Sequence, residues 1–153
     1  MYVNKKVAIL VAPKTNRMNT KIAAYACFIL ASGIVLGALA AHALENLIST
    51  KQLSSFKTGV DYHIYHGLGL LILARFGKVL TSKQLTTLFR LFVVGLIFFS
   101  GSIYFLSTSE IYGLQKINSI VGPITPIGGL ILITTWIIFG IMLIRLKLEP
   151  KKY

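Results

Sequence analysis

Three histidines and one tyrosine carry most of the reactive chemistry in this sequence. Tyr62, His63 and His66 lie on one short segment, and His42 ends the apolar segment before it. On a helix, His63 and His66 are three residues apart, which places their Cβ atoms about 5–6 Å from each other. With His42 and a nearby carboxylate, these nitrogens form a ligand set that suits Zn or Cu. His42, His63 and His66 are therefore the metal candidates of the sequence.

Two other interpretations fit the same residues. Histidine titrates near neutral pH, and ionisable groups inside membranes often mark proton or ion paths, which would indicate a relay or a small permeation site. The simpler interpretation is that His and Tyr form hydrogen bonds between helices and fix a bundle. We take the simpler interpretation as the prediction, with no bound metal and no cofactor. Intramembrane carboxylate pairs, phosphate loops and activated nucleophiles do not occur at motif spacing, so we expect no enzyme.

The composition identifies the environment that these residues occupy. Hydrophobic residues make up 55% of the 153 positions, charged residues make up 13%, and the mean hydropathy is +0.75. A soluble domain of this length does not need so much apolar surface. The net charge of +12 is scattered over several segments, which favours contact with anionic lipid over nucleic acid. We therefore predict an integral membrane protein whose partners are the lipid bilayer and other membrane proteins or a second copy, with no nucleic acid.

Four apolar runs predict an all-α bundle of four transmembrane helices. A hydrocarbon core about 30 Å thick needs about 20 helical residues to cross it. The runs predict helices over about residues 22–43, 58–78, 90–109 and 125–146. The second needs Arg75 and Lys78 to extend out of the membrane, because Asp61 and Arg75 lie close together. Pro126 shortens the last run and makes Thr125 its predicted N-cap.

The basic residues predict the orientation of the bundle. Thirteen of the 16 Lys and Arg residues lie in the two termini and the second loop, and three lie in the other loops. By the positive-inside rule, we predict that both termini are cytoplasmic. The predicted location is the bacterial plasma membrane, that is, the inner membrane. The chain then divides into a basic N-terminal segment (1–20), a four-span membrane domain (21–146) and a basic C-terminal tail (147–153). Met18, directly ahead of the first span, is an alternative translation start.

This topology brings polar residues of all four helices to the outer half of the bundle. On the second helix, Tyr62, His63 and His66 share one sector at 100° per residue and are expected to point into the bundle together. The predicted polar cluster consists of His42, Tyr62, His66, Ser100, Ser102, Tyr104 and Thr125. Small residues that allow close helix contacts are predicted at Gly33, Gly37, Gly101, Gly128 and Gly129.

Four segments, in this order, resemble the signature of a known family. They are GALAAHAL (37–44), FKTGVDYHIYH (56–66), FSGSIY (99–104) and TPIGG (125–129), followed by Trp136. They are similar to the domain-of-unknown-function 423 family, the YgdD-like bacterial inner-membrane proteins, to which the animal transmembrane protein 256 is similar. The resemblance covers roughly residues 19–146.

The resemblance implies a four-helix membrane protein without an assigned activity. It also implies a functional surface at the matching positions, which are His42, Thr58, Tyr62, His66, Ser100, Gly101, Tyr104, Thr125, Pro126 and Gly128. His63 falls where we expect the family to vary, which weakens the three-histidine metal site. We predict a non-enzymatic accessory or interaction subunit. The alternative is a small transporter or channel for a proton, metal ion or small solute that uses His42, Tyr62 and His66.

Overall fold

The computed structural model describes residues 18–148, which form helices and turns with no strand among them. The long segments are α2 (Thr20–His42), α3 (Thr50–Arg75), a third segment made of α4 (Ser82–Leu96), η1 (Ile97–Gly101) and α5 (Ser102–Thr108), and α7 (Ile124–Leu148). Two short helices, η2 (Gln115–Ile117) and α6 (Asn118–Val121), lead into α7. The all-α prediction is confirmed. The predictions for the segment upstream of Met18 and for the tail beyond residue 148 lie outside the described residues.

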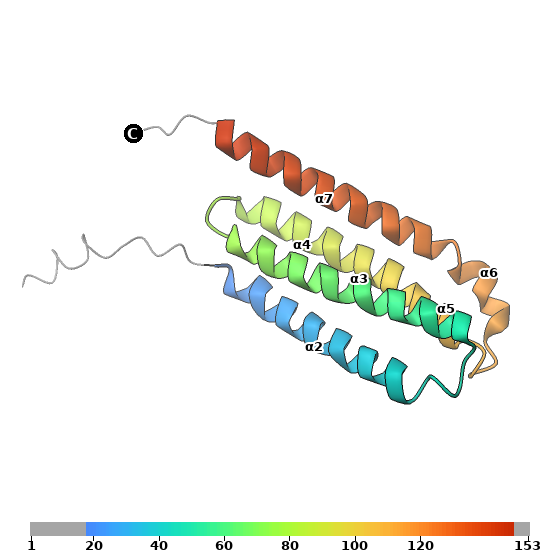
Figure 1. Ribbon diagram of the computed structural model, residues 1–153. Helices are drawn as coiled ribbons and strands as arrows, with labels where there is room; N and C mark the ends of the chain where they lie inside the picture. The colour runs from blue at the N-terminus through green and yellow to red at the C-terminus, as the bar shows by residue number, and fades with distance from the viewer. Residues whose placement is uncertain (1–17, 149–153) are drawn as a thin grey trace, which may run out of the picture.

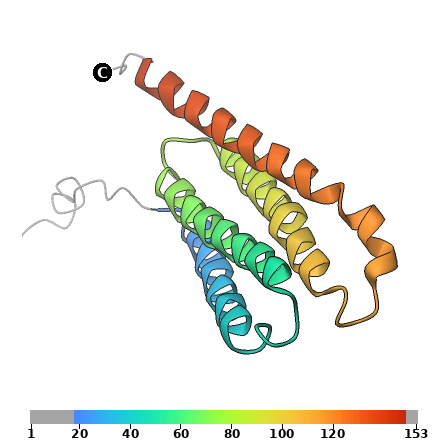
Figure 2. The same ribbon diagram turned by 45° about the vertical axis from the view of Figure 1, so that its right-hand side comes forward.

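The long segments run side by side in alternating directions (Figure 1). Helix α3 lies between α2 and the α4–η1–α5 segment, and α7 packs against α4 and η1 on the side away from α2. The turned view shows α2 and α7 as the two outer members of the bundle (Figure 2). In both views the described chain begins and ends at the same end of the bundle. Helix α3 is therefore packed on both sides, by α2 and by the α4–η1–α5 segment.

Side-chain caps begin three of the long helices. Asn19 caps α2, because its Oδ1 accepts a hydrogen bond from the backbone N–H of Ile22 at 3.2 Å. Ser49 with Gln52 begins α3, and Thr81 with Gln84 begins α4. In each of these capping boxes the two side chains accept from each other's backbone N–H groups, which satisfies donors that a helix start leaves open.

The caps also explain why two helices begin earlier than the sequence predicted. Helix α3 begins at Thr50 instead of near residue 58, and α4 begins at Ser82 instead of near residue 90. Hydropathy finds only the apolar part of a helix, whereas the capping boxes extend each helix into polar sequence. At the last helix Thr125 was predicted as the N-cap. It lies instead inside α7, which begins at Ile124.

Three described stretches are long and apolar enough to cross a membrane: Thr20–His42, Ser82–Thr108 and Gln115–Arg145. Helix α3 has 26 residues and is long enough, but Lys51, Lys57 and Asp61 make its first half polar. Large apolar side chains cover the outside of the bundle, as at Phe28, which is 73% exposed. Such an exterior suits lipid and would be a liability in water.

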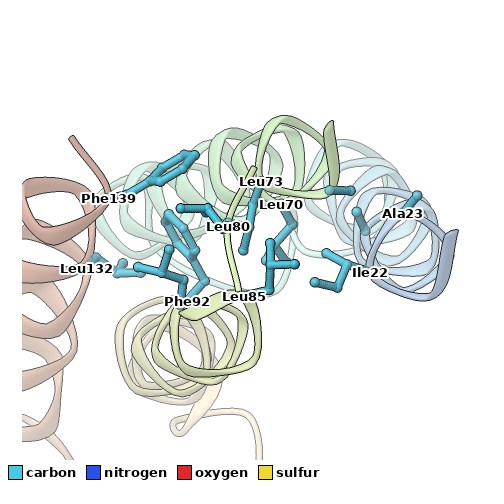
Figure 3. Packing of buried hydrophobic residues seen from close by; sticks show 12 residues of the cluster. Ile22, Ala23, Leu70, Leu73, Leu80, Leu85, Phe92, Leu132 and Phe139 are labelled. Carbon is cyan, nitrogen blue, oxygen red and sulfur yellow. The ribbon is translucent and has the colours of Figure 1, made fainter. Parts of the chain in front are cut away.

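Two apolar clusters hold the helices together. The larger cluster takes side chains from α2, α3, α4 and α7, which meet around Leu70, Leu73 and Phe92 (Figure 3). The smaller cluster contains Ala40, Leu44, Leu53 and Phe56 near the opposite end of α3. The part of α3 between them carries His63 and His66. The histidines thus lie in a polar layer between two apolar clusters.

Candidate functional site

His63 is held by hydrogen bonds to two other helices. Its Nε2 lies 3.2 Å from Ser32 Oγ on α2, and its Nδ1 lies 3.2 Å from Tyr104 Oη on α5. Ser32 donates its only hydroxyl proton to the carbonyl of Ile29 at 2.8 Å. It must therefore accept from His63 Nε2–H, which leaves Nδ1 to accept from the Tyr104 hydroxyl. Both ring nitrogens of His63 are satisfied by the protein.

His66 makes a different set of contacts. Its Nδ1 lies 2.7 Å from the carbonyl oxygen of Tyr62, one turn earlier on α3. A carbonyl can only accept, so Nδ1 carries the proton and Nε2 of the neutral ring is an acceptor. The side chain is only 6% exposed. Among the hydrogen bonds of the described residues, none engages Nε2.

Aromatic rings surround His66. Its ring centroid lies 6.0 Å from that of Tyr62, 6.1 Å from Phe92 and 6.3 Å from Trp136. Tyr62 in turn lies 4.6 Å from Phe99. These rings come from α3, α4, η1 and α7, so the packing of four elements places them.

A groove of about 410 Å³ opens between α3 and α7 at this point. We call it the His66 groove; it is lined by Tyr62, Tyr65, His66, Phe99, Gly129, Leu132, Ile133 and Trp136. A second groove of about 380 Å³ lies between α2 and the α4–η1–α5 segment, beside His63 of α3, and we call it the His63 groove. It is lined by Ile29, Ser32, Leu36, His63, Val93, Leu96, Ile97, Ser100, Gly101 and Tyr104. Each of the two histidines therefore faces a groove of its own.

This arrangement corrects the sequence prediction that Tyr62, His63 and His66 point the same way. His63 contacts α2 and α5, whereas His66 and Tyr62 contact η1, α4 and α7. Residues three positions apart are separated by about 60° around a helix at 100° per residue, and because α3 is packed on both sides this is enough to give the two histidines different neighbours. The sequence prediction used only the angular positions of the three residues on one helix, and it contained no information on the neighbouring helices that each of them contacts.

The structure also divides the rest of the predicted polar cluster. Ser102 and Thr125 form one pair, with their hydroxyl oxygens 2.7 Å apart. Ser102 donates to backbone carbonyls of η1, so Thr125 is the donor between them. Ser100 is 1% exposed, and its hydroxyl has no partner within residues 18–148. His42 is exposed at the end of α2, away from the hydrogen bonds of the other residues.

The three histidines do not form a metal centre. No group of three or more His, Cys, Asp or Glu side chains in the described part of the chain could hold a metal ion. The helical spacing of His63 and His66 was compatible with shared coordination. Their rings have separate hydrogen-bond partners, and His42 is exposed at the end of α2.

Four of the five predicted packing glycines lie against neighbouring helices. A Cβ atom at Gly33 would lie 2.8 Å from Ile64 Cδ1, one at Gly37 would lie 3.4 Å from Val60, and one at Gly129 would lie 3.5 Å from Phe99. At Gly128 it would collide with the backbone of Phe98 and Phe99 in η1. Gly101 is different, because a Cβ there would approach only Ile97 of its own segment, at 4.0 Å.

Sequence reasoning missed several residues of the two grooves. Ser32 is the partner of His63, and Tyr65 and Phe99 line the His66 groove. A signal existed for Ser32, because it is the only serine of α2 and lies in the uncharged run between Lys21 and His42. No spacing rule places Phe99 beside His66 in one groove, because their shared position depends on how η1 packs against α3.

The η1 segment is a π-helix, a wider turn in which the backbone hydrogen bonds join residues five apart instead of four. Such insertions are often found at functional sites. In this protein the π-helix contributes Ile97, Ser100 and Gly101 to the His63 groove and Phe99 to the His66 groove. Its backbone is also packed directly against Gly128 of α7. The π-helix therefore connects both grooves to the packing of α7.

The helices, their apolar exterior and the buried polar layer define an all-α integral membrane protein. The family model described as "Protein of unknown function (DUF423)" matches residues 36–129, more than half of the chain. The chain belongs to this family, as the four sequence segments predicted.

Relatives from several bacteria agree with this assignment. The UPF0382 membrane protein YwdK of Bacillus subtilis is 41% identical over 111 residues, which are 72% of this chain and 85% of YwdK. A UPF0382 membrane protein of Staphylococcus saprophyticus is 40% identical over 105 residues, covering 69% and 81% of the two chains. One from Haemophilus influenzae is 31% identical over 104 residues, covering 68% and 77%. No solved structure matches the chain.

Proposed function

We propose that this protein crosses the bacterial inner membrane four times, with both termini in the cytoplasm, and acts as a non-enzymatic accessory or interaction subunit. The alternating helix directions and the shared end of the described termini support an even number of spans (Figure 1). Helix α3, too polar at its start to qualify by composition, is shielded by α2 on one side and by α4 and α5 on the other. His66 is buried and His63 half-buried in its second half, where a spanning helix tolerates polar groups inside protein, whereas the charged Lys51, Lys57 and Asp61 are exposed in its first half, toward the outer end.

The packed interior of the bundle is the observation that favours an accessory or interaction subunit over a channel or transporter. On one side of the polar layer, Leu70, Leu73, Leu88 and Phe92 are fully buried. On the other side, Phe56 and Ala40 fill the space between α2 and α3. A channel or transporter needs a polar path or a water-filled cavity across the bundle. The two grooves lie instead along its sides, where a neighbouring protein or a lipid-soluble molecule has access.

Two measurements test this proposal together. Native mass spectrometry of the protein, extracted in mild detergent from its own membrane, should give a complex of defined stoichiometry with another membrane protein or with a second copy. Proteoliposomes should show proton and monovalent-ion flux no greater than empty liposomes. A lone monomer in native spectra would contradict the interaction role, and flux that disappears in His66→Phe would support the transporter instead.

A further inference from the structure

His66 presents an unused hydrogen-bond acceptor to a groove. Its Nδ1–H is committed to the Tyr62 carbonyl at 2.7 Å, which leaves the Nε2 lone pair without a partner in the described structure. His63, three residues earlier, has both nitrogens satisfied by Ser32 and Tyr104. His66 Nε2 is not one of the fully enclosed side-chain atoms that lack a partner in the described structure, so it is accessible from the groove, and in a hydrocarbon environment no water satisfies it there. The contrast marks His66 as a residue whose second partner comes from outside the chain.

The walls of the His66 groove indicate the shape of that partner. Tyr62, Phe99 and Trp136 line it together with aliphatic side chains. Trp136 packs closely on α3, because a Cβ at Gly69 would lie 2.8 Å from its ring. The volume of about 410 Å³ is in the range of small-molecule sites. Flat rings beside the imidazole acceptor of His66 suit a flat, mainly apolar molecule that has a hydrogen-bond donor.

The depth of the groove restricts the charge of the partner. Trp136 lies at the middle of α7, about 18 Å from each end at a rise of about 1.5 Å per residue. If α7 spans the membrane as proposed above, the groove lies near the centre of a hydrocarbon core about 30 Å thick. Phospholipid headgroups do not reach this depth, and a charged molecule there is unfavourable. The partner must therefore be uncharged and soluble in the membrane.

We propose that the His66 groove binds an uncharged, membrane-soluble molecule with a hydroxylated aromatic ring, of the hydroquinone class. The ring hydroxyl donates a hydrogen bond to His66 Nε2. The ring lies against Tyr62, Phe99 and Trp136, and an aliphatic tail extends from the open side of the groove into lipid. No chemical step is involved, since the groove is lined by aromatic, aliphatic and hydrogen-bonding groups that hold the ligand without changing it.

Trp136 provides a direct readout, because it is the only tryptophan of the chain and it lines the groove. The full-length protein in lipid nanodiscs is titrated under argon with 2,3-dimethyl-1,4-naphthohydroquinone, and its fluorescence quenching is recorded. The dimethyl ether of the same ring is the matched probe, because it lacks the hydroxyl donors. We expect saturable quenching by the hydroquinone at a concentration about tenfold lower than by the ether, as one buried hydrogen bond implies.

Variants assign this preference to His66. His66→Phe should bind the two probes equally, whereas His66→Gln, which keeps an acceptor, should retain part of the preference. His42→Phe, the same change at an exposed histidine outside the groove, should behave as the native protein. Melting curves in nanodiscs confirm that each variant is folded.

Three outcomes would overturn the assignment: quenching that does not saturate, equal binding of both probes by the native protein, or a preference that survives in His66→Phe. Equal, saturable binding of both probes would identify the groove as a general apolar lipid site. None of these results bears on the accessory role, which the native spectra and flux measurements decide separately. The proposal depends on the proposed function only in placing α3 and α7 within the membrane.

Discussion

At the scale of single residues, the hydroxyl and imidazole groups of the polar layer differ in how many partners they have. Tyr104 and Ser32 satisfy His63, and Thr125 satisfies Ser102. Ser100, two residues from Ser102, is buried without a partner among the described residues. Neighbouring residues of the same type should therefore respond differently to substitution.

Ser100→Ala and Ser102→Ala form a matched pair that tests this difference. Removing the Ser102 hydroxyl leaves Thr125 without its partner, so we expect a loss of about 1 kcal/mol in the free energy of unfolding. Removing the Ser100 hydroxyl deletes a buried, unpaired group, so stability should stay the same or rise. Reversible unfolding in mixed detergent measures both. Equal destabilisation by the two substitutions would contradict the hydrogen-bond assignment.

Tyr104→Phe tests the hydrogen bond that positions His63. The substitution keeps the ring contact with Phe56, whose centroid is 4.7 Å away, and removes only the hydroxyl. We expect a loss of about 1 kcal/mol in stability, because Nδ1 of His63 then has no donor. Tyr112→Phe is the control, since Tyr112 is 71% exposed. A change no larger than that of the control would show that Tyr104 acts through packing alone.

The sequence predicted which residues are polar at this depth but not how they pair. The sequence alone showed the apolar runs and the polar residues within them or at their ends. The divergence of His63 from His66 was not, because it depends on α3 being packed on both sides. Trp136 and Phe99 join His66 only through the positions of α7 and η1. Patterns along one helix therefore located the polar layer and could not divide it into two grooves.

At the scale of elements, the contact between α7 and the π-helix determines the shape of the His66 groove. Gly128 lies directly against the backbone of η1, where a Cβ would be 2.6 Å from the Phe98 carbonyl carbon. A neighbouring side chain could rotate away, but a backbone can move only with its helix. The absence of a side chain at Gly128 is thus a condition for this helix contact.

Gly128→Ala should separate α7 from η1. We expect a loss of several kcal/mol or failure to fold, because overpacking against a backbone costs about 1–3 kcal/mol or more. Gly140→Ala is the matched control in the same helix, since nothing lies within 4 Å of its Cβ position. It should be neutral or slightly stabilising, as alanine favours helix over glycine. Thermal unfolding in detergent compares the two, and similar melting temperatures would refute the close contact.

At the scale of the whole molecule, the distribution of charge and the helix directions lead to the same topology. The first and third loops are poor in basic residues, whereas the second loop is rich in them. The described chain ends lie at the same end of the bundle as the second loop (Figure 2). The polar start of α3 then lies at the outer face, where Gln52 donates to Glu110 near the end of α5 at 2.9 Å.

Cysteine labelling of intact cells tests this topology. The native Cys27 is first replaced by Ala, because it is an exposed free thiol. Single cysteines are then placed at Ser54, near the outer end of α3, and at Lys83, near the start of α4; both positions are exposed on the protein. A membrane-impermeant maleimide should label Ser54→Cys in intact cells and Lys83→Cys only after the membrane is opened. Labelling of both sites in intact cells would show that α3 does not cross the membrane. The reverse pattern would show that the orientation is opposite to the one proposed. The basic segments would then lie outside the cell, contrary to the positive-inside rule from which the orientation was derived.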